Sequence, residues 1–170
     1  MCALFVALMT AAAFIKIPFP LVPLTFQTVT AVLSGLLLGA KKGAASMAAY
    51  CFAGLLGLPV FTSGGGIHYV TMPTFGYIIG FIASAFIAGL IARDGTSVRR
   101  VTVAAIIAFL VDYIIGTPYC IVVAAIGGTY DLVNVLVMWN LIYMPKDFAL
   151  CIIAALIARS VRPAINKIRG

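Results

Sequence analysis

Residues 74–92, TFGYIIGFIASAFIAGLIA, form an uncharged run of 19 residues, and the polar and basic segment RDGTSVRR follows directly at 93–100. A helix needs about 20 apolar residues to cross the hydrocarbon core of a bilayer. The run therefore predicts a transmembrane helix. Because arginines and lysines gather in the loops on one side of a membrane, the basic segment predicts that the chain leaves the membrane after residue 92.

The composition of the whole chain agrees with a membrane protein. Of the 170 residues, 64% are hydrophobic and 9% are charged, whereas a soluble domain carries about 25% charged residues. The net charge of +7 comes from eleven Lys and Arg against four Asp. These bases form small clusters between apolar runs, without the aromatic interleaving or the motifs of nucleic-acid-binding proteins. We therefore expect a lipid bilayer as the partner, and no nucleic acid.

Breaks of charge, proline and glycine divide the chain into six apolar stretches. We expect an all-α integral membrane protein, a single domain over 1–170 formed by a bundle of six transmembrane helices. Lys41 and Lys42 are expected to end the second helix, and Gly116 and Pro118 to interrupt the fifth. Several stretches have only about 16 residues, so the bundle should be thin or its polar ends should dip into the bilayer. The predicted helices cover 2–17, 24–40, 43–58, 74–92, 101–126 and 146–161.

The distribution of the bases predicts the orientation of this bundle. With six spans, nine of the eleven bases fall on one face, which the positive-inside rule makes cytoplasmic together with both termini. Only Lys16 and Lys146 fall on the other face, where snorkelling at a helix end is the plain alternative to a functional role. The short first helix also suggests a chain that lacks an N-terminal extension. The nine bases are Lys41, Lys42, Arg93, Arg99, Arg100, Arg159, Arg162, Lys167 and Arg169.

Ionisable and polar residues near the outward face are the candidates for a binding site. An ionisable group inside a membrane span is costly unless it is paired or faces a cavity, and Asp112 and Asp147 both qualify. The alternatives are a helix–helix ion pair for Asp112 and a helix cap for Asp147. Gln27 is either a donor in a pocket or a cap. The glycine-rich loop at 59–72 is either a flexible lid over a pocket or a plain connection.

Catalytic and metal-binding patterns are missing from the sequence. It contains no G-x-S-x-G, no P-loop and no zinc spacing, so we expect no enzyme activity, and the energy for any transport must come from other subunits. The four cysteines lie far apart in apolar segments, so we expect neither a metal site nor a cofactor. They are Cys2, Cys51, Cys120 and Cys151.

Several blocks resemble the BioY family, the biotin-binding S components of energy-coupling-factor (ECF) vitamin transporters. They are PLTFQTVTAVLSGLLLGAKKGA at 23–44, GLLGLPVFTSGGG at 54–66, PTFGYIIGF at 73–81 and MPKDFALCIIAALIA at 144–158. The resemblance implies a six-helix subunit in the plasma membrane of a prokaryote, which captures biotin on the outer face. It also implies three partner subunits, a transmembrane coupling subunit and two ATPases.

The family's pocket and docking surface can be carried over to residues of this chain. The pocket falls on Gln27, Thr62, Ser63, Gly64, Gly65, Tyr77 and Asp147, and the residue-level argument adds Asp112. The family signature for docking to the coupling subunit falls on Ala3, Ala7 and Ala11. The family lysine three residues after the aspartate is replaced by Leu150. We expect Lys146 to supply that positive charge, although a side chain one position away on a helix points about 100° off.

Other functions remain open at this stage. Related S components bind thiamine, riboflavin or other small nutrients, and the blocks at 59–66 and 73–77 favour biotin among these. A membrane enzyme acting on lipid head groups would need a cluster of carboxylates, which four scattered Asp do not provide. A purely structural membrane subunit is the third alternative.

Overall fold

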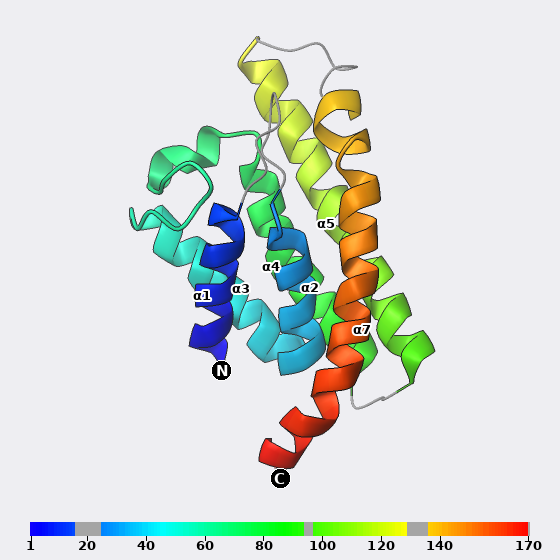
Figure 1. The fold of residues 1–170 in the computed structure, drawn as a ribbon. Coiled ribbons are helices and arrows are strands. Elements are labelled where there is room, and N and C mark those ends of the chain that lie inside the picture. Colours follow the sequence, from blue (N-terminus) through cyan, green and yellow to red (C-terminus); the bar gives the residue numbers. More distant parts are fainter. Residues whose placement is uncertain (16–24, 94–96, 129–135, 170) are drawn as a thin grey trace.

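The computed structural model describes residues 1–15, 25–93, 97–128 and 136–169. Within them the chain forms six α-helices, which confirms the predicted number (Figure 1). A 3₁₀ helix, η1 (Ile67–Thr71), and a π-helical turn, η2 (Val137–Leu141), lie in the connections. The α-helices are α1 (Cys2–Phe14), α2 (Gln27–Leu38), α3 (Ala40–Leu55), α4 (Phe75–Ala92), α5 (Val98–Ile126) and α7 (Met144–Arg169).

Several helix boundaries differ from the sequence-based expectation, and the last helix continues to Arg169 instead of ending at about 161. The second helix ends at Gly39, whose φ of 85° lies in the left-handed region that favours glycine, and Lys41 and Lys42 belong to the first turn of α3. The predicted interruption of the fifth helix is wrong, because α5 continues through Gly116 and Pro118. A proline is tolerated inside a membrane helix when neighbouring helices hold the turn that it weakens.

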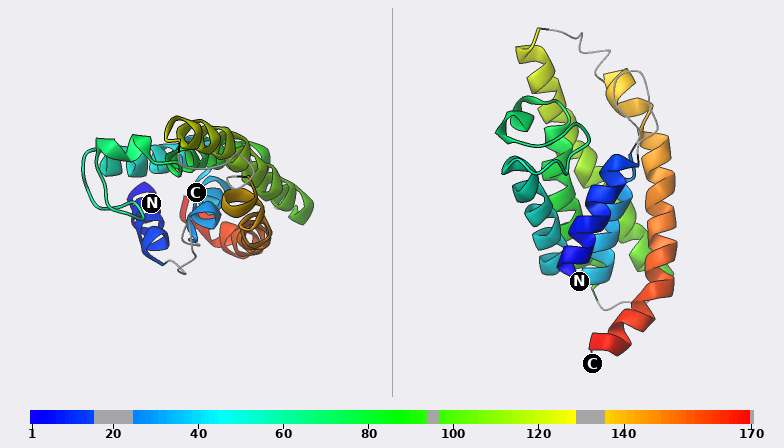
Figure 2. Two further views of the ribbon diagram at one scale, coloured as in Figure 1. Left: turned by 90° about the horizontal axis from the view of Figure 1, so that it is seen from above. Right: turned by 60° about the vertical axis from the view of Figure 1, so that its left-hand side comes forward.

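Helix α4 lies in the middle of the bundle and packs against α2, α3 and α5 (Figure 2). Its small residues serve packing inside the bundle. A Cβ added at Gly80 would lie 2.3 Å from Oδ1 of Asp112 on α5, and a Cβ at Gly89 would lie 2.1 Å from the backbone nitrogen of Ala40. Helices approach this closely only where side chains are small. The glycines of α4 therefore set the distances within the bundle.

Both termini lie at one end of the bundle (Figure 1). The α2–α3 turn, the C-terminal end of α4 and the N-terminal end of α5 lie at the same end. Lys41, Lys42 and Arg93 are at this end, as the charge pattern predicts. Arg162 of α7 also reaches it, where its guanidinium donates to the carbonyl oxygens of Ala92 and Arg93 at the end of α4. Residue 16, the proline-rich connection up to 24, and the side chains of Lys167 and Arg169 lie outside the described residues.

The length and hydropathy of the helices fit a thin bundle. Among the described residues, α4 and α5 are long and apolar enough to cross a membrane, each with a mean hydropathy of 2.1 over its best window. Helices α1 and α2 are apolar but have only 13 and 12 residues. At about 1.5 Å per residue, each spans roughly two thirds of a hydrocarbon core of about 30 Å.

Candidate ligand-binding site

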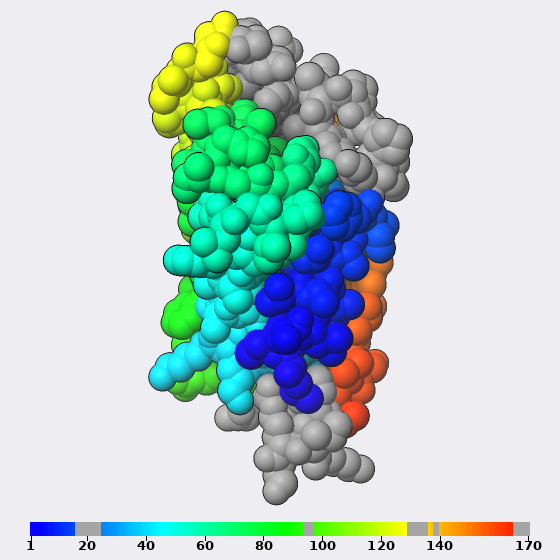
Figure 3. Space-filling model, turned by 90° about the vertical axis from the view of Figure 1, so that its left-hand side faces the viewer, coloured from blue at the N-terminus to red at the C-terminus, as the bar shows by residue number. Residues whose placement is uncertain are grey.

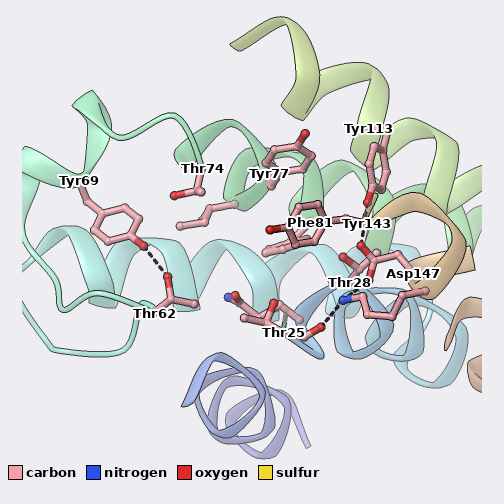
Figure 4. Close-up of a pocket in the computed structure, with 13 residues that line it drawn as sticks. Thr25, Thr28, Thr62, Tyr69, Thr74, Tyr77, Phe81, Tyr113, Tyr143 and Asp147 are labelled. Atoms are coloured by element: carbon pink, nitrogen blue, oxygen red, sulfur yellow. Dashed lines mark hydrogen bonds and ion pairs between the residues drawn. The ribbon is translucent and has the colours of Figure 1, made fainter. Parts of the chain in front are cut away.

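A cavity opens at the end of the bundle opposite to the termini, between the first turns of α2, α4 and α7, the middle of α5 and the loop around η1 (Figure 4). It encloses about 710 Å³ of space without protein atoms, part of which is open to solvent. The lining residues are Thr25, Gln27, Thr28, Thr62, Tyr69, Thr74, Tyr77, Ile78, Phe81, Tyr113, Tyr143, Lys146 and Asp147.

Lys146 and Asp147 form the charged part of the cavity at the start of α7. Nζ of Lys146 lies 2.7 Å from Oδ1 of Asp147, as an ion pair whose angle does not meet hydrogen-bond geometry. The same nitrogen donates to the carbonyl oxygen of Thr25 at 2.7 Å, and the Tyr113 hydroxyl donates to Oδ2 of Asp147 at 2.8 Å. The long lysine stem bends back over the helix, so the expected 100° offset does not keep its ammonium away from the carboxylate. The cavity thus presents a cation and a carboxylate side by side.

Gln27 connects the cavity to the glycine-rich loop. Its side-chain amide donates to the Tyr50 hydroxyl at 2.9 Å, and that hydroxyl donates to the carbonyl oxygen of Val60 at 3.0 Å. Phe61 is fully buried, with its ring centroid 5.4 Å from that of Tyr50 and 4.5 Å from that of Tyr69. The loop is therefore anchored to the bundle by aromatic side chains.

The two loop residues that reach the cavity are Thr62 and Tyr69, whose hydroxyls lie 2.8 Å apart (Figure 4). Ser63, Gly64 and Gly65, which were predicted as binding residues, do not line the cavity. Two glycine amides of this loop are bonded within the protein. The Gly64 N–H donates to the carbonyl of Phe61 at 3.3 Å, and the Gly66 N–H donates to that of Gly54 at 2.7 Å. These amides close the loop on itself and on α3.

Aromatic rings form a wall of the cavity along α4 and α5. Tyr77 and Tyr113 pack edge to face with their centroids 5.6 Å apart, and Phe81 follows Tyr77 one turn later on α4. A Cβ at Gly116 would lie 2.3 Å from the Tyr77 ring, so the absence of a side chain there lets the ring lie flat against α5. Such a wall suits a flat or ring-shaped apolar group.

Asp112 lies behind the cavity wall. Its side chain is fully buried, and Oδ2 accepts from the Thr28 hydroxyl at 3.4 Å. Oδ1 has no hydrogen-bond partner among the described residues and faces Gly80. Thr28 lines the cavity and Asp112 does not. In this arrangement Asp112 therefore contacts the cavity lining through Thr28.

Of the predicted site residues, the structure brings Gln27, Thr62, Tyr77, Lys146 and Asp147 to one cavity. Sequence reasoning missed eight lining residues, all hydroxyl-bearing or apolar side chains that are ordinary in membrane helices. Their one sequence signal is their spacing, since Thr25 and Thr28 flank Gln27 and two others lie one and four positions after Tyr77. The missed residues are Thr25, Thr28, Tyr69, Thr74, Ile78, Phe81, Tyr113 and Tyr143.

Comparison with known proteins identifies the family. The model of the BioY family matches residues 1–167. The chain belongs to the BioY family. A Lysinibacillus sphaericus protein named probable biotin transporter BioY is 39% identical over 179 residues, which cover 100% of this chain and 89% of that protein. The biotin transporter BioY of Rhizobium etli is 30% identical over 172 residues, covering 94% and 89% of the two chains.

A solved structure has the same fold as this BioY chain. It is described as the S component for biotin from an ECF-type ABC transporter, and it matches with a TM-score of 0.72 and 26% sequence identity. The match covers 95% of this chain and 88% of that one. The chain is thus a helical membrane protein of the transporter S-component type.

Two features bear on the BioY pattern stated from the sequence. Leu150, which stands where the family has a lysine, is half-buried and does not line the cavity. Helix α1 lies on the surface of the bundle beside α3 (Figure 3). The three alanines predicted to dock a partner, Ala3, Ala7 and Ala11, are all exposed, whereas Phe5 and Met9 on the other side of α1 are buried.

Proposed function

We propose that this chain is the biotin-binding membrane subunit of an ECF-type ABC importer, which captures biotin on the outer face for uptake. The observation that carries the proposal is the family match over residues 1–167, with relatives named as biotin transporters. The cavity supports it, because it combines a carboxylate, a cation and an aromatic wall in one space.

The chemistry of biotin suits these groups. Its ureido ring has two N–H donors and one carbonyl, its second ring is an apolar thioether, and its tail ends in a carboxylate. Asp147 accepts a ureido N–H in a charge-assisted hydrogen bond. The rings lie against Tyr77 and Tyr113, and the Lys146 ammonium attracts the tail carboxylate. Gln27 and Thr28 supply further polar contacts at the start of α2.

The surroundings of the chain follow from its charges and surfaces. The basic end of the bundle faces the cytoplasm of a prokaryote, so the cavity opens to the outside across the plasma membrane. We expect a transmembrane coupling subunit to dock on the exposed alanine face of α1, since small side chains let helices approach closely. Two ATPase subunits on the cytoplasmic side supply the energy, and this chain does not hydrolyse ATP.

Titration of the purified chain with biotin tests the proposal. The chain is expected to retain biotin after purification from biotin-containing medium, and Asp147→Asn is expected to weaken binding at least about tenfold, the loss of about 1.4 kcal/mol. Asp112→Asn is the matched control, because it makes the same chemical change at a carboxyl that does not line the cavity. The affinity of the Asp112→Asn variant for biotin should fall less than about threefold.

A panel of other ligands completes the test. Thiamine and riboflavin should not compete with biotin at equal concentration. A chain that binds one of them and not biotin refutes the biotin assignment while leaving the S-component role. Unchanged biotin affinity in Asp147→Asn removes this carboxylate from the site.

A further inference from the structure

A polar cluster lies directly behind the aromatic wall of the cavity. It consists of Tyr77 on α4, Thr117 on α5 and Asn140 on the π-helical turn η2. The hydroxyls of Tyr77 and Thr117 both donate to Oδ1 of Asn140, the latter at 2.6 Å. An amide oxygen has two lone pairs, so this oxygen is fully used by the two hydroxyls.

The cluster determines how Tyr77 faces the cavity. The ring is held flat against α5 at Gly116 and edge-on against Tyr113, and the hydroxyl is bound to Asn140. Because the hydroxyl hydrogen points to Asn140, Tyr77 cannot donate it to a ligand without losing that bond. The residue therefore presents its ring to the cavity, in one fixed orientation.

The backbone of Asn140 connects the same cluster to the acidic wall of the cavity. Its carbonyl oxygen accepts from the Tyr143 N–H at 3.0 Å, and the Tyr143 carbonyl accepts from the Asp147 N–H at 3.0 Å. Tyr143 and Asp147 both line the cavity. Asn140 is itself 4% exposed and does not line it. One buried residue thus holds the aromatic wall through its side chain and the acidic wall through its backbone.

We propose that Asn140 is a positioning residue that determines ligand specificity by setting the distance between the Tyr77 ring and the Asp147 carboxylate. The inference rests on the proposed function of this cavity and adds a residue that does not contact the ligand. A π-helical turn places one extra residue in a helical turn, and such turns are frequent at functional sites. Here it turns the Asn140 side chain towards α4 and α5.

A ligand that contacts both walls is sensitive to the position of each. A bicyclic ligand bound through its ureido N–H at Asp147 reaches the Tyr77 ring with its second ring. Desthiobiotin keeps the ureido ring and the tail but lacks the sulfur-containing ring. Loosening Tyr77 should therefore weaken biotin more than desthiobiotin, whereas general damage to the fold should weaken both alike.

A double-mutant cycle on the full chain in detergent tests the inference. Tyr77→Phe removes only the hydroxyl, and Asn140→Leu replaces the amide by an apolar group of similar volume. Each is expected to weaken biotin binding about tenfold and desthiobiotin less than about threefold. In the Tyr77→Phe background, Asn140→Leu should cost less than about twofold further, because the contact is already lost.

Two results overturn the inference. One is that the losses of biotin affinity in the single variants multiply in the double variant. The other is that biotin and desthiobiotin lose affinity equally. If Asn140→Leu does not fold, Asn140→Ala replaces it in the same cycle, since it also removes the amide oxygen that accepts from Tyr77.

The melting temperatures of the ligand-free variants give a second readout. Non-additive shifts for Tyr77→Phe and Asn140→Leu support the contact, and additive shifts overturn it. This readout needs no ligand, so it still decides the matter if the wild-type chain binds no biotin. Absence of biotin binding by the wild-type chain would refute only the proposed function.

Discussion

Replacing Gly80 by alanine tests how tightly α4 and α5 are packed beside the cavity. The new methyl carbon would lie 2.3 Å from Oδ1 of Asp112, 3.0 Å from its carbonyl oxygen and 3.2 Å from its Cα. The first distance is far below van der Waals contact, so Asp112 must rotate or the helices must separate. Rotation would break the 3.4 Å hydrogen bond from Thr28. Overpacking of this kind typically costs about 1–3 kcal/mol in the free energy of unfolding.

The measurement is the melting temperature of the purified chain in detergent. For a chain of this size, about 1–3 kcal/mol corresponds to a decrease of about 2–12 °C. The sharper test uses the Asp112→Ala background, in which the 2.3 Å contact cannot form and only the two backbone contacts remain. There the Gly80→Ala decrease should be less than half as large, because the two sites share one contact.

A control variant and a clear negative result complete this test. Val122→Ile adds a methyl group on α5 at a side chain that is 55% exposed, and it should change the melting temperature by less than about 2 °C. Equal decreases for Gly80→Ala with and without Asp112 would show that the carboxyl does not occupy the space in front of this glycine. The reasoning about α4–α5 packing would then be wrong.

Two further predictions concern the ligand tail and the partner. Lys146→Met should lower the preference for biotin over its neutral amide about tenfold, while Lys146→Arg should keep most of that preference. An unchanged preference in Lys146→Met would show that the ammonium does not contact the carboxylate tail of biotin. Ala7→Trp should reduce co-purification with the coupling subunit at least about tenfold and leave biotin affinity unchanged, because a large side chain blocks close helix approach. Val122→Trp, on the exposed face of α5, is the matched control, and equal assembly of both variants would place the docking surface elsewhere.

The number of helices followed from the sequence because lipid imposes a simple constraint. Charged residues and clustered prolines cannot stay in a hydrocarbon core, so they mark the ends of spans. Exact boundaries did not follow. Lysine side chains can extend their ammonium groups to the membrane interface from inside a helix. Lys41 and Lys42 therefore do not mark the end of the second helix, which Gly39 terminates. Pro118 was wrongly taken as an interruption because its effect depends on the helices packed around it.

The binding site was only partly predictable for a related reason. Lys146 and Asp147 stood out because ionisable groups are rare in a membrane protein. Gln27 stood out as a polar residue at the start of a helix, and Thr62 and Tyr77 came from the family resemblance. Tyr113 and Asn140 gave no comparable signal. Tyrosine and asparagine are unremarkable in such a sequence, and the importance of these two arises from their contacts in the fold, Tyr113 with Asp147 and Asn140 with Tyr77.

Asp112 and Asp147 show why an ionisable residue in a span does not by itself define a binding site. Both are buried aspartates, and the sequence rule treated them alike. Asp147 stands next to a lysine that neutralises it and leaves it on the cavity wall, so it can exchange one partner for a ligand. Asp112 is enclosed between Gly80 and Thr28, so its influence on a ligand must pass through the threonine hydroxyl. The difference comes from what each carboxylate faces, and for Asp112 this is Gly80, a residue more than 30 positions earlier in the sequence.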